Sequence, residues 1–389
     1  MNFLRTTSTR SLIAGTVLSA ALVVGVVAAA TAAGGGASPP PAKPLEAAIH
    51  DSLAAPKPAG ITARVRFTNN LIANGALPLG SPILTGGSGR LWASGDGVRL
   101  ELQSDAGDAQ ISIADGRISV YDAASNTEYR AKVPAKAASD HADDGKSGVP
   151  PTAKIADVLS QLAQDATISG ADPTTQAGQP AYEVSVTPKH DAGLLGRAQL
   201  AWDAANGIPL RISLAAAGSS SPVLALDVTD ISYGTVDAGA LAITAPADAR
   251  VVDLGSLGGA KGTGTSAHAG TTGLDAVSAA VPFKLSAPAT LVGLPRTGVR
   301  LIGNGSDAAA LVTYGKGLGV IAVLERAAKK SEDNPLEGLP SVSIGGATGH
   351  ELPTALGTII TAERDGVSYT LIGSLPPNAA EAALRAVLA

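Results

Sequence analysis

The chain has 389 residues and no cysteine. This absence excludes a disulfide framework, thiolate catalysis, a thiolate metal site and lipoprotein anchoring through a cysteine thioether. Aromatic residues are also scarce, with three Phe, two Trp and six Tyr, so stacking platforms for nucleic-acid bases are not expected. The net charge is -5 and no basic patch stands out along the sequence. The composition therefore predicts no nucleic-acid partner.

Charge is missing from one long stretch near the start of the chain. Leu12 to Ala33 carry no charged residue, whereas Arg5 and Arg10 precede them. A positive region, an apolar run and the small residues Ala30-Thr31-Ala32 form a secretory signal pattern. Because the run also reaches bilayer length, residues 1–33 are expected to be either a cleaved signal peptide or a retained transmembrane anchor. Both alternatives predict an exported protein, secreted or anchored to the cell membrane on its extracytoplasmic side.

Two stretches poor in apolar residues divide the rest of the chain. Residues 34–44 are rich in Gly and Pro and are expected to be a linker. Residues 254–273 are rich in Gly and are expected to be a second linker. The sequence thus predicts a first domain over 45–253 and a smaller α+β domain over 274–389.

The first domain begins with a short helical pattern at Leu45–Leu53, and apolar and polar residues then alternate in short runs. Strands at this spacing, separated by turn residues, are typical of an antiparallel meander, and Asn206-Gly207 is the strongest hairpin signal. A second helix is expected from Thr152, acting as N-cap, to Leu162. The predicted fold class is α+β, with a highly curved antiparallel half-barrel sheet, covering helices, and one apolar face.

The second domain shows four strand-like segments and a final helix. The strands are expected near 309–314, 319–324, 357–362 and 367–372. The final helix is predicted to start at Asn378 as its cap, with Glu381 completing a capping box.

Motifs that carry chemistry are absent. The sequence has no HExxH, no nucleophile elbow and no phosphate-binding loop between a strand and a helix. None of the five histidines has a second histidine at metal-ligand spacing. His141 lies among Asp140, Asp143 and Asp144, where a solvated polar loop is the favoured interpretation and a weak cation site the alternative. The sequence predicts no catalytic residues, no cofactor and no metal, and therefore a protein that is not an enzyme.

The strand pattern from Gly86 to Pro134 resembles the LolA/LppX-like lipoprotein-carrier superfamily, and in particular its MucB/RseB-type regulator branch. The residues that carry the resemblance are Leu91-Trp92, Arg99-Leu100-Glu101, Ile111 to Ile113, Asp115-Gly116, Val120-Tyr121-Asp122, Tyr129 to Pro134, Ala201-Trp202-Asp203 and Gly207 to Arg211. The resemblance extends over about residues 45–253. A second, smaller domain in the same chain favours the regulator branch.

The resemblance implies an unclosed β-barrel around helices, with an apolar cavity for acyl chains. The candidate lining residues are Val65, Phe67, Leu91, Val98, Leu100, Leu102, Ile111, Ile113, Ile118 and Val120. Two functions are therefore expected as alternatives. The first is an extracytoplasmic binding protein that takes up a lipid or acylated ligand in this cavity. The second is an RseB-type regulatory module that binds a membrane protein such as an anti-sigma factor. A fully packed core without a cavity also remains open.

Overall fold

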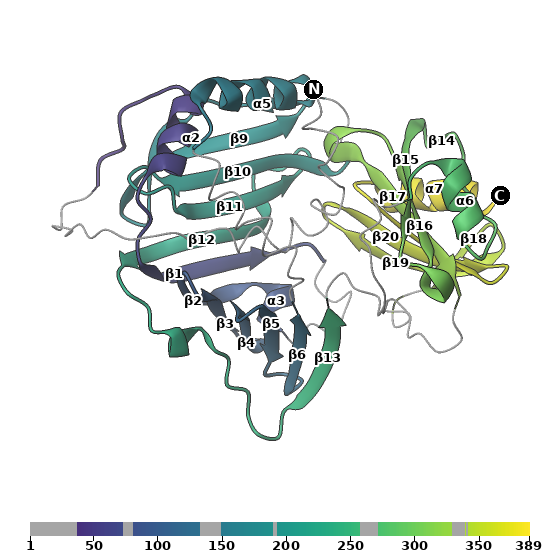
Figure 1. The fold of residues 1–389 in the computed structure, drawn as a ribbon, viewed down its shortest axis with the longest axis horizontal. Helices are drawn as coiled ribbons and strands as arrows, with labels where there is room; N and C mark the ends of the chain where they lie inside the picture. Colours follow the sequence, from purple (N-terminus) through teal and green to yellow (C-terminus); the bar gives the residue numbers. More distant parts are fainter. Residues whose placement is uncertain are drawn as a thin grey trace.

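The computed structural model describes residues 37–72, 81–132, 149–189, 193–256, 271–328, 339 and 341–389, which form two β-sheets with a few helices. The fold is the predicted α+β type, with a curled half-barrel sheet in the first part of the chain and a second sheet after it (Figure 1). The predicted N-terminal signal or anchor and the His141 loop lie outside the described residues.

The first sheet has 13 strands in the order β13-β6-β5-β4-β3-β2-β1-β12-β11-β10-β9-β7, with β8 paired to β9. Its strands are β1 (Gly60–Asn69), β2 (Gly87–Ser94), β3 (Gly97–Ser104), β4 (Gly107–Ala114), β5 (Arg117–Asp122), β6 (Thr127–Lys132), β7 (Ala166–Ile168), β8 (Asp172–Gln176), β9 (Gln179–Pro188), β10 (Leu195–Asp203), β11 (Pro209–Ala216), β12 (Pro222–Tyr233) and β13 (Arg250–Ser256). The first strand lies in the middle, because it pairs with β2 on one side and with β12 on the other.

Turn chemistry explains why the meander folds where the sequence predicts it. Asp115 and Gly116 between β4 and β5 both have positive φ, 52° and 67°. That combination is the type I′ turn, whose twist matches the twist of the two strands. The predicted Asn206-Gly207 hairpin also forms, between β10 and β11.

One strand departs from the antiparallel pattern. After β12 the chain passes over the outer face of β2–β4, where the 3-10 helix η2 (Ala238–Leu241) buries Leu241. The Ser112 hydroxyl donates to the Leu241 carbonyl at 2.6 Å. The chain then adds β13 beside β6 in parallel. Hairpin signals predict only local, antiparallel neighbours, so they could not predict this return.

Within the described ranges, three helices accompany this sheet. Helices α2 (Leu45–Ala54) and α5 (Thr152–Asp165) pack at β9 and β10, where α2 contributes to a cluster around the buried rings of Tyr182 and Trp202. The short α3 (Pro82–Thr85) lies near β1, β3 and β4. The predicted N-cap of α5 is wrong by one residue: Pro151 occupies that position and Thr152 is the first helical residue. Proline at the boundary fixes φ where the helix begins.

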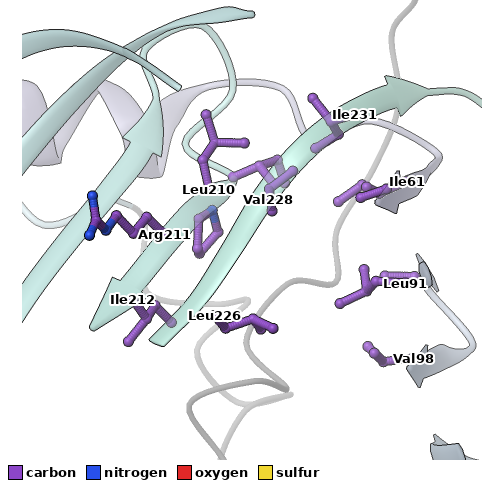
Figure 2. A pocket seen from close by; sticks show the side chains of 13 residues that line it. Ile61, Leu91, Val98, Leu210, Arg211, Ile212, Leu226, Val228 and Ile231 are labelled. Carbon is purple, nitrogen blue, oxygen red and sulfur yellow. The ribbon is translucent and has the colours of Figure 1, made fainter. Parts of the chain in front are cut away.

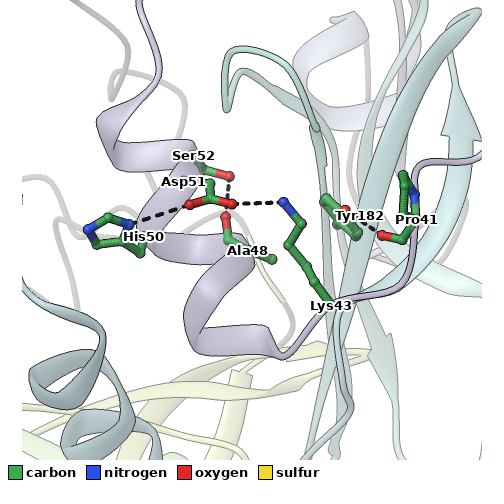
Figure 3. A network of polar contacts seen from close by, with 7 residues as sticks. All are labelled: Pro41, Lys43, Ala48, His50, Asp51, Ser52 and Tyr182. Atoms are coloured by element: carbon green, nitrogen blue, oxygen red, sulfur yellow. Dashed lines mark hydrogen bonds and ion pairs between the residues drawn. The ribbon is translucent and has the colours of Figure 1, made fainter.

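The end of the predicted N-terminal linker is held against this sheet (Figure 3). The buried Tyr182 hydroxyl donates to the Pro41 carbonyl at 2.6 Å, and Lys43 forms an isolated bridge with Ala171. Lys43 Nζ also lies 2.7 Å from a carboxylate oxygen of Asp51 and 5.5 Å from the Tyr182 ring centre. The hydrogen bond to Asp51 is the main reason that the pKa of Lys43 is raised. Polar contacts of the backbone and of one lysine therefore fix a segment that has few apolar side chains.

Replacing Tyr182 with phenylalanine should loosen this segment without disturbing the sheet. The change removes one hydrogen bond, and we expect it to lower the free energy of unfolding by about 1 kcal/mol. Amide exchange at Lys43 and Ala171 should become faster, as measured by hydrogen exchange. Tyr121→Phe is the matched control, because it removes a hydroxyl that bonds Asn126 on the far side of the same sheet. Equal exchange in wild type and Tyr182→Phe would contradict the assignment.

The second sheet has eight strands in the order β14-β15-β16-β17-β21-β20-β19-β18. Its strands are β14 (Thr290–Leu291), β15 (Leu294–Ile302), β16 (Ala309–Tyr314), β17 (Ile321–Ala327), β18 (Ser341–Ile344), β19 (Ala347–Thr354), β20 (Gly357–Arg364) and β21 (Val367–Gly373). Helices α6 (Leu274–Ala280) and α7 (Pro377–Leu388) supply Val277, Ala383 and Leu384 to its core. The capping box predicted for α7 is wrong, because the helix begins at Pro377 and the Asn378 side chain accepts from Ala379 instead.

A glutamate lies inside this second core. Glu325 on β17 has no exposed surface, and its Oε2 accepts the Ser286 N–H at 2.9 Å. Its Oε1 and the nearby buried Tyr314 hydroxyl have no hydrogen-bond partner among the described residues. Burial raises the pKa of Glu325 to about 7, because a charge is poorly solvated there.

Backbone hydrogen bonds connect the two sheets. The Leu194 N–H, next to β10, donates to the Ser374 carbonyl at 3.0 Å, and the Ala355 N–H donates to the Leu71 carbonyl at 2.8 Å. The Ser374 hydroxyl also accepts the Leu195 N–H at 2.9 Å. The ends of β20 and β21 are thereby fixed near the ends of β1 and β10.

Candidate functional site

The ten predicted lining residues lie on one face of the first sheet, here called the inner face. The register places Leu91 opposite Leu100, and Leu100 opposite Ile111, so one apolar row crosses β2, β3 and β4. The row continues onto β5 at Val120, and a parallel row joins Val98, Ile113 and Ile118. Val65 and Phe67 on β1 and Leu102 on β3 complete the set. Because side chains alternate along a strand, the polar residues between them point to the opposite, outer face.

Burial divides these ten residues into three groups. Val65 and Leu102 are only 2% and 1% exposed, so they belong to the packed core. Leu91 and Val98 are half-buried and line a hollow, while Phe67 and Leu100 pack against the core beside it. The remaining four, on β4 and β5, are half-buried and belong to none of the core clusters; they are Ile111, Ile113, Ile118 and Val120.

The hollow lies between the two halves of the curved sheet (Figure 2). On one side Ile61, Leu91 and Val98 come from β1, β2 and β3. On the other side Leu210 and Leu226 come from β11 and β12, which follow much later in the chain. These later residues were missing from the predicted lining. Their alternating pattern is visible in the sequence, but only the pairing of β1 with β12 brings them to this position.

The hollow is small. Its volume is about 70 Å³. An engineered apolar cavity of about 150 Å³ in another protein stays dry and binds benzene, which is far smaller than an acyl chain. The hollow therefore cannot enclose a fatty acyl chain unless the surrounding strands move apart.

Beyond the hollow, the inner face continues onto β4, β5 and β6, away from helices α2 and α5, while the short α3 packs against β3 and β4. We call Ile111, Ile113, Ile118, Val120 and Tyr129 the open part of the inner face. Tyr129 on β6 pairs with Val120 and is 39% exposed. Helices α2 and α5 lie at β9 and β10, at the other end of the strand order. The open part thus presents a row of apolar side chains on a firmly hydrogen-bonded sheet.

The described residues offer no obvious site for metal chemistry. Among them, no three His, Asp or Glu residues gather closely enough to hold a metal ion. None of the helices within the described ranges is both long and apolar enough to cross a membrane. The geometry of the inner face favours binding through apolar contact.

Comparison with known proteins gives matches at the level of structure alone. No family model and no curated protein matches the chain. A complex of MucA and MucB from Pseudomonas aeruginosa matches with 16% identity and a TM-score of 0.41, covering 87% of this chain and 94% of that chain. A crystal structure of MucB matches with 18% identity and a TM-score of 0.40, covering 88% and 96%. A conserved protein of Thermus thermophilus matches 50% of this chain and 90% of its own, at 12% identity and a TM-score of 0.32.

The MucB structures are of the type that the strand pattern resembles. At this identity and TM-score the likeness extends no further than the general path of the chain.

Proposed function

We propose that the chain is an extracytoplasmic, non-enzymatic binding protein of the regulatory type, which binds a segment of a membrane-protein partner on the open part of the inner face. A membrane-anchored regulator such as an anti-sigma factor is the partner class that the sequence resemblance suggests. The observation that carries the proposal is the partly exposed apolar surface of β4, β5 and β6, where five apolar or aromatic side chains remain half-buried or exposed.

A polypeptide segment fits this surface better than an acyl chain does. Apolar side chains of an extended or helical segment can lie on a shallow face and gain about 25 cal/mol for each Å² that they bury. An acyl chain needs to be enclosed, and the hollow of about 70 Å³ is too small for that. The lipid-carrier function therefore ranks second.

Site-directed photo-crosslinking tests the proposal on the full chain in its native membrane. Benzoylphenylalanine in place of Ile118 should crosslink to one membrane protein, because Ile118 lies on the inner face. The matched control is the same change at Ser119, the next residue on β5, whose side chain points to the outer face. Crosslinking to lipid from position 118 would support the carrier function instead. If positions 118 and 119 gave the same crosslinked proteins in equal yield, the result would contradict a specific site on the inner face.

A further inference from the structure

The outer face of the first sheet carries several arginines, and three of them have an acidic partner. Arg211 on β11 lies 3.1 Å from Asp227, and Arg130 on β6 lies 2.7 Å from Glu128. Arg99 on β3 is paired with Glu101 and also lies over the Trp92 ring, 5.6 Å from its centre. Each of these charges is neutralised on the same face of the sheet.

Three neighbouring arginines are different. Arg64 and Arg66 on β1 and Arg90 on β2 are exposed, and their guanidinium groups form no ion pair or hydrogen bond with any described residue. The register places Arg64 directly opposite Arg90. Side chains at such positions start about 5 Å apart, and like charges there destabilise the sheet. Asp230, which lies opposite Arg64 on β12, forms no ion pair with it.

We propose that Arg64, Arg66 and Arg90 form a docking site for an acidic polypeptide segment in extended conformation. A bound row of carboxylates would neutralise the three guanidinium groups, which prefer planar, bidentate partners. Arg64 and Arg66 are two residues apart on one strand, which is the side-chain period of an extended chain. The chain as a whole is acidic, with a net charge of -5. The positive charge of these three arginines is therefore a local feature of the outer face.

A single peptide fits this arginine cluster better than a membrane surface does. Acidic residues flank the three arginines, with Asp227 and Asp230 on β12 and Glu101 on β3. A broad anionic surface would bring its charges against Asp230, the one of these carboxylates that has no arginine partner among the described residues, whereas one strand can run past it. The site lies on the opposite face from the open part of the inner face. It can therefore exist whether or not the proposed partner binds there.

The test uses the full chain in neutral detergent and a fluorescent oligoglutamate peptide, with oligoglutamine as its uncharged counterpart. We expect binding of oligoglutamate alone, and a Kd about tenfold higher for the double variant Arg64→Gln/Arg90→Gln. The control is Arg117→Gln/Arg250→Gln, which removes two exposed arginines from β5 and β13 of the same sheet. Binding should weaken when salt rises from about 0.15 M to about 1 M, because the Debye length shrinks.

Three results would overturn the docking site. Oligoglutamate could fail to bind the wild-type chain. The control variant could weaken binding as much as the test variant. The effect would then come from the net charge of the chain and not from the three arginines. Vesicles containing phosphatidylglycerol could bind through Arg64 and Arg90 while oligoglutamate does not, which would assign the site to an anionic lipid surface. None of these outcomes bears on crosslinking at Ile118, so this test and the partner test remain separate.

Discussion

The free energy of unfolding of the second sheet should fall by about 3 kcal/mol between acidic and alkaline pH. Replacing Glu325 with glutamine is expected to abolish this fall. The pKa of Glu325 rises from its ordinary value of 4.5 to about 7, because the carboxylate is buried. The folded chain therefore holds this proton more tightly than the unfolded chain does. The stabilising effect is complete below about pH 4.5, declines as the pH rises to about 7, and is absent above that.

Glutamine keeps the shape of the protonated acid and does not titrate, so Glu325→Gln should lack this decline. The second sheet has no tryptophan, because Trp92 and Trp202 both belong to the first sheet. Hydrogen exchange of the β17 amide groups is therefore the suitable measurement, at about pH 5 and about pH 8.5. Glu363→Gln is the control, since that carboxylate lies in solvent on β20 of the same sheet. A parallel pH dependence in wild type and Glu325→Gln would show that the buried carboxyl is not responsible.

The second large effect is expected at Leu102. This side chain is 1% exposed and packs in the core of the first sheet. Leu102→Ala should lower the free energy of unfolding by about 3 to 4 kcal/mol, because it removes buried methyl groups and leaves a cavity. Ile113→Ala on the open part of the inner face should cost only about 1 kcal/mol, because Ile113 is already partly in water.

Urea unfolding followed by tryptophan fluorescence measures both variants, since Trp92 and Trp202 report on this sheet alone. The effects on partner binding should be reversed: Ile113→Ala should weaken crosslinking at position 118, whereas Leu102→Ala should preserve it under conditions where the chain stays folded. Similar losses of stability in the two variants would mean that the open part is as tightly packed as the core. The proposed binding surface would then lose its main support.

The sequence predicts the local part of this fold well. Alternation placed Leu91, Leu100 and Ile111 on one face, and the Asp115-Gly116 turn set the register between β4 and β5. These features depend on residues that are close in the chain, where the period of two and the turn type fix the geometry.

The sequence could not predict the arrangements that depend on distant residues. The neighbours of β1 and β6 include β12 and β13, and no local pattern specifies them. Leu102 is buried in a cluster that joins β1, β3, β11 and β12, whereas Ile113 lies outside every core cluster, so one list of lining residues covered both. For the same reason Arg64 and Arg90, which are distant in the chain, did not form a visible basic patch in the sequence.

The central position of β1 has a consequence for the order in which the strands of the first sheet can pair. Synthesis proceeds from the N-terminus, so the meander β1–β6 is complete long before β12 and β13 have been made. During this interval both of its outermost strands have unpaired backbone groups, which are templates for pairing with other chains. Closing these long loops is also entropically slow. Both edges of the early half of the protein therefore stay open to pairing with other chains until the two late strands arrive to cover them.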